Sequence, residues 1–416
     1  MAIVNQNDTY IHYSYILKEF FILLKDESIQ LPQERIGSIS IVNDYINNLF
    51  PIMSVDISID ASTYYKILRN KEDIKFKIRI QKFYTKNMDS VPADVYEDYL
   101  SKTFTLIMDD EEEDFDEELR KLQYGENEQN DLFATKYQIQ FFLFDAVLMK
   151  TMKQTINQIF ENGTVTGAIA YMASRVGIEN LLMTRADNMT EYPQLIIPPM
   201  KLSHALTFID TFYGIHENGS MIFFGHDRGY LLRYDGKCSA YEANEKKEIS
   251  IVIPKTDSVI ANNICQLKRQ EQPSEVFMIA DYKTMTFYDE SVTQDILIGK
   301  EVRIIDVNSG EIEDTLDNDE DGRRRIILNS GYNKYFKKIY KSQVASTEAV
   351  ITLTLQDIDL SMLTPNKKFK FIFEDITLSR KYKGNYILAK TEIMMVRGSN
   401  EYTVLVNCVF RKSIEE

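Results

Sequence analysis

The chain has 416 residues, and 44% of them are hydrophobic, so it can bury the cores of two or three domains. Its formal net charge of −15 argues against free binding to duplex DNA, because neutralising phosphates requires a basic surface. Three cysteines, Cys238, Cys265 and Cys408, are too few and too scattered for a disulfide framework. No segment approaches the apolar length of a membrane span, and residues 1–8 lack the layout of a signal peptide. We therefore expect a soluble protein that is made in the cytoplasm.

Alternation of apolar and polar residues predicts strands in the first third of the chain. Residues 55–59 (VDISI) and 74–80 (IKFKIRI) place every second side chain on an apolar face. Such alternation is typical of an antiparallel sheet or small barrel with one face on a core. Residues 10–25 are apolar and rich in aromatics, and their periodicity fits a helix as well as a strand.

The composition changes sharply between residues 105 and 136. Every residue from Asp109 to Glu118 except Phe115 is acidic, and a polar tract follows at residues 125–130. So few apolar residues cannot offset the entropy cost of ordering, which predicts a flexible, solvated insertion. An acidic binding arm is the alternative interpretation.

The middle of the chain has helical spacing followed by turn signals. We expect helices over about 145–160, 164–176 and 202–212, with Gly177 ending the second. Prolines should hold residues 196–199 (IIPP) as an extended connector. Asn218-Gly219 lies between two apolar segments, and this pair predicts a tight hairpin because both turn residues need positive φ.

Strand-like segments follow the hairpin to the end of the chain. Residues 229–234 and 248–253 fit two strands joined through the turn at Asp235-Gly236, and Pro254 marks a domain boundary. The further candidates are 275–282, 295–307, 324–329, 349–357, 368–374, 386–397 and 401–411. Seven strands separated by turns predict a second antiparallel barrel over residues 257–416.

The order of elements in residues 140–235 resembles the central baseplate hub proteins of contractile-tailed bacteriophages. The same module occurs in the hub part of spike proteins from contractile injection systems. The matching features are two helices, the IIPP connector at 196–199, a helix that ends in YGI at 213–215, and a hairpin. They cover about a quarter of the chain and include no catalytic signature.

This resemblance implies an α+β, mostly β fold, with two antiparallel, tube-like β-barrel domains and a small helical α/β insertion. The first barrel would comprise residues 1–144, with the acidic insertion at about 105–136, and continue over 219–256. Residues 145–218 would form the insertion domain and residues 257–416 the second barrel. The resemblance implies a virion protein of the tail baseplate that is assembled in the host cytoplasm.

The resemblance also implies an assembly and its partners. Family members form homotrimers, in which two barrels per subunit match a hexameric tail tube on one side and a threefold central spike on the other. The implied partners are the tube or tube-adaptor protein, the spike, the baseplate wedge proteins and the tape-measure protein. The ring would let DNA pass without specific nucleic-acid binding.

One motif resembles a calcium loop. Residues 317–322 (DNDEDG) fit its first half, but Leu328 occupies the twelfth position, where a bidentate Glu is required. Arg323, Arg324 and Arg325 also place three cations beside the site. The segment is interpreted as an exposed turn between strands.

The histidines do not form a zinc motif, because His204 and His216 lack a second histidine at the required spacing. His12 stands alone, whereas His216 and His226 with Asp227 could meet across neighbouring strands and hold a metal. The sequence also lacks a nucleophile elbow, a P-loop and a dinucleotide-binding fingerprint. We predict a non-enzymatic protein with no catalytic, cofactor-binding or metal-binding residues and no cofactor, although its many acidic residues leave room for a catalytic carboxylate pair.

The distribution of charge allows several functions. Arg323–Arg325, Lys334, Lys337, Lys338, Lys341 and residues 367–383 make the last third locally basic, whereas the first third is acidic. Such opposite surfaces suit docking between different partners, and a solvated strand face explains them equally well. The alternatives to a phage hub are the hub of a non-phage contractile injection system, a tail-associated cell-wall hydrolase and a carbohydrate-binding tail protein.

Overall fold

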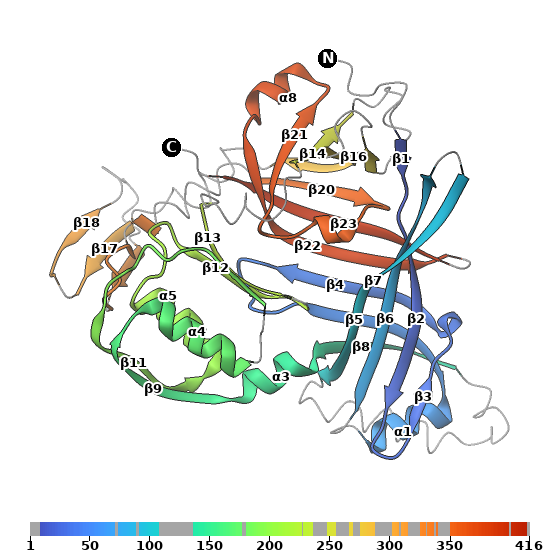
Figure 1. Ribbon diagram of the computed structural model, residues 1–416, viewed down its shortest axis with the longest axis horizontal. Helices are drawn as coiled ribbons and strands as arrows, with labels where there is room; N and C mark the ends of the chain where they lie inside the picture. Colours follow the sequence, from blue (N-terminus) through green and yellow to red (C-terminus); the bar gives the residue numbers. More distant parts are fainter. Residues whose placement is uncertain are drawn as a thin grey trace.

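The computed structural model describes residues 9–70, 74–88, 91–107, 136–176, 180–226, 228–235, 248–254, 266–268, 275–287, 302–307, 309–314, 325–329, 331–336, 338–339, 350–398 and 401–413. The fold is mostly β, as predicted, and most of its strands belong to one 15-stranded sheet that curves around the molecule (Figure 1). Among the described residues, no helix is both long and apolar enough to cross a membrane.

The N-terminal part of the sheet closes on itself. The pairing order is β22-β4-β5-β8-β7-β6-β2-β23, and β23 pairs again with β22, so these strands form a first circuit. The contact between β2 and β23 is the single pair Tyr15–Tyr402. The strands of this circuit are β2 (Ser14–Leu23), β4 (Ile36–Asp44), β5 (Ile52–Asp60), β6 (Lys75–Met88), β7 (Val91–Ile107), β8 (Lys136–Asp145), β22 (Asn385–Arg397) and β23 (Tyr402–Lys412).

The C-terminal part of the sheet forms a second circuit that shares β22 and β23 with the first. Its order is β22-β21-β14-β16-β20-β23. The additional strands are β14 (Glu248–Ile253), β16 (Glu275–Phe287), β20 (Val350–Gln356) and β21 (Lys368–Phe373). The two circuits are therefore parts of one continuous sheet.

Not every pair in the second circuit is antiparallel, contrary to the prediction. β14 runs parallel to both β16 and β21. The reason is that β15 (Gln266–Lys268), which is antiparallel to β16, runs back between β14 and β16 in the chain. Short strands β1 (Thr9–Ile11) and β3 (Ser28–Gln30) pair with β15 and β2 at the edges.

One hydrophobic core fills both circuits. The predicted alternation is confirmed, because Val55, Ile57, Ile78 and their neighbours on the apolar face are fully buried. Residues 10–25, which fitted helix or strand, contain β2, and its alternate side chains join the same core. Buried side chains of the described residues thus pack the interior of both circuits.

Short helices complete the circuits. Helix α1 (Ala61–Arg69) follows β5, and Asp60 caps it by accepting a hydrogen bond from the Thr63 amide at 2.8 Å. Helix α8 (Ile376–Lys381) follows β21, and 3₁₀ turns lie at η1 (Gln33–Arg35) and η4 (Leu360–Met362).

A separate α/β part with its own core follows β8. It contains a β9–β11 pair, a β10-β13-β12 sheet and three helices beside them (Figure 1). Its elements are α3 (Ala146–Lys153), β9 (Thr155–Gly163), α4 (Val165–Val176), β10 (Leu181–Met183), β11 (Tyr192–Lys201), α5 (Leu202–Phe212), β12 (Ser220–Phe224) and β13 (Gly229–Arg233).

One expectation for the helices of this part was wrong, and the extended conformation expected for residues 196–199 is confirmed, although within a strand. The helix predicted over 145–160 ends at Lys153, because residues 155–163 pair with β11 and this tertiary pairing outweighs their helical spacing. Residues 196–199 are accordingly part of β11, and the register shifts between Ile197 and Met200, where the two prolines lie.

The hairpin predicted around Asn218-Gly219 forms instead between the next two strands of the chain, β12 and β13. β12 pairs with β13, and next to the connection between them the Gly225 amide donates to the Arg228 carbonyl at 2.8 Å. Asn218 and Gly219 instead precede β12, with Gly219 at a φ of 94°. Residues 219–256 are also divided differently from the prediction, since β12 and β13 form a sheet with β10, through the β10–β13 pair, whereas β14 belongs to the second circuit.

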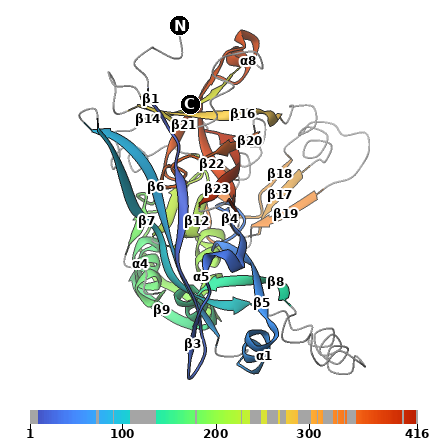
Figure 2. The same ribbon diagram turned by 90° about the vertical axis from the view of Figure 1, so that its right-hand side faces the viewer.

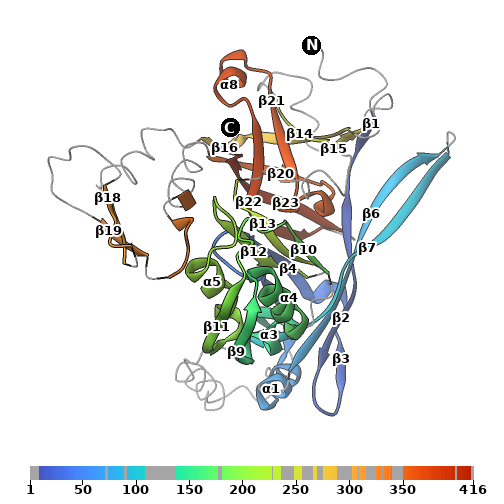
Figure 3. The ribbon, with the colours of Figure 1, turned by 60° about the vertical axis from the view of Figure 1, so that its left-hand side comes forward.

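A small sheet of β18 (Ile312–Asp314), β17 (Val302–Asp306) and β19 (Arg325–Asn329) lies apart from the main sheet. Figures 2 and 3 show it projecting to one side of the molecule. These strands were expected in the second barrel, but β17 pairs only with β18 and β19 among the described strands.

Candidate interaction sites

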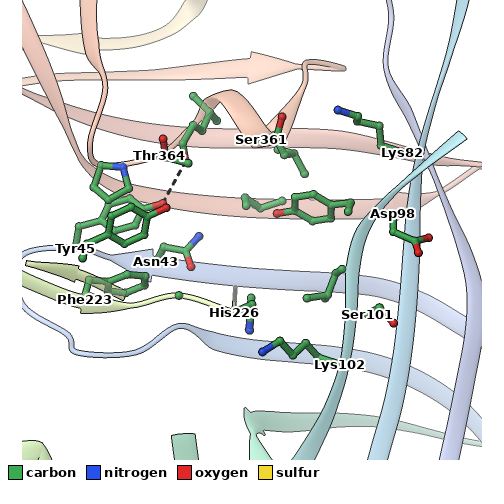
Figure 4. Close-up of a pocket in the computed structure, with 18 residues that line it drawn as sticks. Asn43, Tyr45, Lys82, Asp98, Ser101, Lys102, Phe223, His226, Ser361 and Thr364 are labelled. Atoms are coloured by element: carbon green, nitrogen blue, oxygen red, sulfur yellow. Dashed lines mark hydrogen bonds between the residues drawn. The ribbon is translucent and has the colours of Figure 1, made fainter. Parts of the chain in front are cut away.

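A cavity of about 350 Å³ lies where β7, the β12–β13 turn, the η4 region and β4 meet. Aromatic rings of Tyr45 and Phe223 form one wall, edge to face at 4.7 Å. Figure 4 shows Lys82, Lys102 and His226 around the rest of the cavity. The site is thus built from segments far apart in sequence and combines apolar and ionisable groups.

A buried ion pair lies at one end of the cavity. The Lys82 ammonium donates to both oxygens of Asp359 at 3.1 Å and contacts Glu97 at 2.8 Å. Burial by itself would lower the pKa of Lys82, but Asp359 and Glu97 outweigh it and raise that pKa above its ordinary value. Asp359 also accepts bonds from the amide and hydroxyl of Ser361. The pair therefore fastens β6 to the segment between β20 and β21.

A second carboxylate approaches the cavity from β8. Asp145 is almost completely buried, and the Lys102 ammonium lies 3.4 Å from its Oδ2. The Nδ1 of His226 is 4.0 Å from the same oxygen, and its ring lies edge to face against Phe104. In the described part of the chain, no group of three or more His, Cys, Asp and Glu side chains has a metal-binding arrangement.

The other candidate histidine, His216, belongs to a buried polar chain in the α/β part. Its Nε2 lies 2.8 Å from the Thr184 hydroxyl and its Nδ1 lies 3.0 Å from the Ser220 hydroxyl, which donates to Asp210 at 2.7 Å. Burial, assisted by Arg233, lowers the pKa of His216 to about 4, and burial raises the pKa of Asp210. His216 is therefore neutral at pH 7, and it contacts different groups from those around His226.

An arginine joins the loops next to this chain. Arg233 on β13 contacts Asp187 at 2.6 Å, Asp235 at 2.9 Å and Glu217 at 3.4 Å. Asn218 donates to Asp235 at 2.6 Å, so the Asn-Gly pair that was expected in a hairpin turn belongs to this cluster. This cluster holds the 184–188 and 216–218 loops against the β10-β13-β12 sheet.

Several sequence features lie outside the described residues or have structural roles. The acidic run at 109–118, the calcium-like loop at 317–322 and Asp227 are outside them. Of the basic residues, Lys338 pairs with Glu217 at 2.9 Å. Cys408 is fully buried on β23, and burial raises the pKa of its thiol well above the ordinary value.

One outward wall of the first circuit is charged. On β2, β6 and β7, Lys77 contacts Glu19 at 2.7 Å, and Arg79 contacts both Glu19 at 3.3 Å and Asp98 at 3.1 Å. These ion pairs are exposed, so they contribute little to stability and mark a surface that faces solvent.

The opposite wall, on β23, β22, β4, β5 and β8, differs in composition. A row of paired positions crosses these strands outside the core: Leu405, Met394, Ser40, Ser54 and Phe142. We call this row and its neighbours the uncharged face. Met394 and Phe142 are 47% and 48% exposed. Charged residues such as Asp56 and Glu392 lie at its borders.

A second exposed apolar row crosses the small projecting sheet. Ile305 on β17 pairs with Ile312 on β18 and with Leu328 on β19, so the three lie side by side. Ile312 and Leu328 are 61% and 58% exposed. A contiguous exposed apolar row of this kind is a candidate contact surface.

The sequence matches the family described as Bacteriophage PBS1 gene 109 protein over residues 7–413. The chain belongs to this family. A comparison with curated proteins finds no match.

The fold of this chain is also similar to the folds of several solved structures. A tail protein from Neisseria meningitidis MC58 is 11% identical, with a TM-score of 0.52 over 96% of this chain and 97% of that one. The 43 kDa tail protein of prophage MuSo2 from Shewanella oneidensis is 9% identical, with a TM-score of 0.48 over 94% and 96%. An Escherichia coli component of the type VI secretion system is 8% identical, with a TM-score of 0.42 over 95% and 77%.

The family and the fold together confirm the predicted resemblance to proteins of contractile tails, and they support a structural role in a phage tail. The sequence did not reveal the ion pair between Lys82 and Asp359, whose partners are 277 residues apart. The sequence indicates part of the uncharged face, because Ser38, Ser40 and Ser54 occupy the polar positions of strands in which apolar and polar residues alternate.

Proposed function

We propose that this phage-family protein is the hub of the tail baseplate, where three copies form a ring between the hexameric tail tube and the threefold central spike. The presence of two strand circuits in one chain carries this proposal. Three copies with two circuits each present six similar modules to a sixfold tube while keeping threefold symmetry toward a spike. A chain with one circuit would not resolve this difference in symmetry.

The continuous sheet should keep the two circuits of each copy in a fixed arrangement within the ring. The two circuits share β22 and β23, and Lys82 of the first circuit binds Asp359 next to the second. A linker between separate domains would allow hinge motion, whereas shared strands and a common core resist it. The two circuits of each copy should therefore move as one body when the tail contracts.

DNA would pass through the centre of the ring, because packed side chains fill both circuits. The net charge of −15 favours this passage, since a surface of like charge does not retain phosphates. We assign the barrels to the first circuit and the second circuit, and the α/β part to residues 145–235. Tube or tube-adaptor, spike, wedge and tape-measure proteins are the proposed partners in the virion, and assembly takes place in the host cytoplasm.

Electron cryomicroscopy of the purified assembly tests the proposal. We expect top views with three copies around an open centre and six lobes of similar size. Adding the tail tube protein should cap one side of the ring and adding the spike the other. Rings with another number of copies, or particles that bind neither component, would contradict the hub assignment. Release of peptidoglycan fragments by the isolated protein would instead favour the hydrolase alternative.

A further inference from the structure

We propose that neighbouring copies in the ring join through two different surfaces, with the projecting β17–β18–β19 sheet of one copy seated on the uncharged face of the next. This inference rests on the proposed trimer and specifies its contact. It takes the row of Ile312, Ile305 and Leu328 as the inserted surface and the row through Ser40 and Ser54 as the receiving surface.

The receiving row contains Met394 and Phe142, which are residue types enriched at interfaces, and its two serines are small and uncharged. The row carries Met, Phe, Leu and Ser at outward positions, while the intervening residues Ile41, Val55 and Leu143 are buried in the core. Interface cores are depleted of charge and enriched in Met and aromatic residues. The two outward walls of the first circuit therefore differ, because the wall formed by β2, β6 and β7 carries ion pairs.

The size of this face fits a contact between copies. The strands β23, β22, β4, β5 and β8 of this face are neighbours, and at about 4.8 Å between strands they span about 19 Å. With three outward residues along each strand, of which Asp56 and Glu392 are the charged ones at its borders, the face covers about 400 Å² of flat area. A standard interface buries about 800 Å² on each partner, so the face can supply about half of it.

The inserted surface is held firmly by the segment that follows it. The Asn333 side chain donates to the carbonyls of Asp210 and Thr211 at the end of α5, at 3.1 and 3.2 Å. The Tyr335 hydroxyl donates to the carbonyl of Asp187 at 3.0 Å. Anchoring after β19 lets the sheet project from the body, as Figure 3 shows, while its base stays attached to α5.

A second copy is the occupant that best explains both surfaces. A closed ring of three requires heterologous contacts, in which each copy uses one patch toward each neighbour. A single self-complementary patch would stop at a dimer. Copies that each carry a net charge of −15 also repel, so their contact should form where charge is scarce on both sides.

Glutamate substitutions on the two surfaces test the contact by the mass of the particles in solution. S54E places a charge in the receiving row, and L328E places one in the inserted row. Both should weaken self-association on the order of 100-fold and yield monomers, because each buries an unpaired charge. The matched control, S101E, lies on the charged wall opposite Arg79 and should leave the trimer intact.

A mixture of S54E and L328E provides the decisive result. S54E keeps its inserted surface and L328E keeps its receiving surface, so one contact can form between them and no more. Chemical crosslinking should capture a species with one copy of each variant, and neither variant alone should give it. S40E and I312E serve as second variants of each surface, and circular dichroism verifies that all of them are folded.

Some outcomes overturn the proposal without affecting the ring. A trimer that persists in both S54E and S40E, or in both L328E and I312E, would show that the contact lies elsewhere. A mixture without the crosslinked pair would overturn the two-surface arrangement. Loss of assembly in S54E and S40E, with trimers retained in L328E and I312E, would show that the uncharged face contacts another segment of the neighbouring copy. A wild-type protein that is monomeric at every concentration would instead refute the proposed trimer.

Discussion

Removing the cation from the Lys82–Asp359 pair should destabilise the protein more than removing the anion. Lys82 is 11% exposed and Asp359 is 5% exposed, so both charges are shielded from water. Replacing Lys82 with Met removes the cation that contacts both oxygens of the Asp359 carboxylate. Loss of one partner of a buried pair costs about 3–5 kcal/mol. Replacing Asp359 with Asn should cost less, about 1–3 kcal/mol, because Lys82 keeps its contact with the half-exposed Glu97.

The double variant K82M/D359N separates the interaction energy between the two side chains from the other effects of each substitution. Both charges are then absent, so its destabilisation should be at least about 1 kcal/mol smaller than the sum of the single variants. Thermal unfolding followed by near-ultraviolet circular dichroism, at one fixed protein concentration, measures all four proteins. Fixed concentration matters because assembly raises the midpoint by mass action.

Three results would refute this reasoning. Equal midpoints for K82M and D359N would show that Glu97 does not compensate Lys82 for the loss of Asp359, and a K82M midpoint equal to that of the wild type would show that the Asp359 carboxylate does not depend on Lys82. Additive effects in the double variant would show that the two side chains do not interact, whatever their distance.

Three further predictions concern the core and the buried histidine. The pKa of His216 is lowered to about 4 in the folded protein, so its contribution to stability is complete above pH 6.5 and is lost as the pH falls from 6.5 to 4. The difference in the free energy of unfolding between wild type and H216Q should therefore shrink by up to about 3 kcal/mol as the pH falls through this window. A difference that stays constant with pH would contradict this prediction. The raised pKa of Asp210 changes stability in the opposite direction, but it does so in both proteins. Replacing the fully buried Ile78 with Asp should abolish folding or trimer formation, and a soluble, normal trimer would argue against its place in the core. The Cys408 peptide should resist alkylation until the protein is unfolded, as peptide mapping after iodoacetamide treatment would reveal.

The sequence predicted the strands whose one face is buried. Val55 and Ile78 follow a period of two because each strand has one side against the core, and this local pattern is sufficient to identify them. The same reasoning correctly placed Val404 and Val406 of β23 on a buried face.

Features that depend on distant partners were missed or misplaced. Residues 155–163 have helical spacing, and only their pairing with β11 makes them a strand. The cavity combines β4, β7, the β12–β13 turn and residues near Leu360, and no local pattern indicates that these segments meet. The β12–β13 hairpin was missed, and Asn218, which was expected in a hairpin turn, instead donates to Asp235, 17 residues away, a contact that a short-range turn rule does not include.

The mass of the purified protein in solution tests the central claim most directly. The account predicts particles of three times the chain mass of 48.5 kDa, either for the protein alone or when the spike protein is added. A protein that remains monomeric with and without tail components would contradict the hub and its ring.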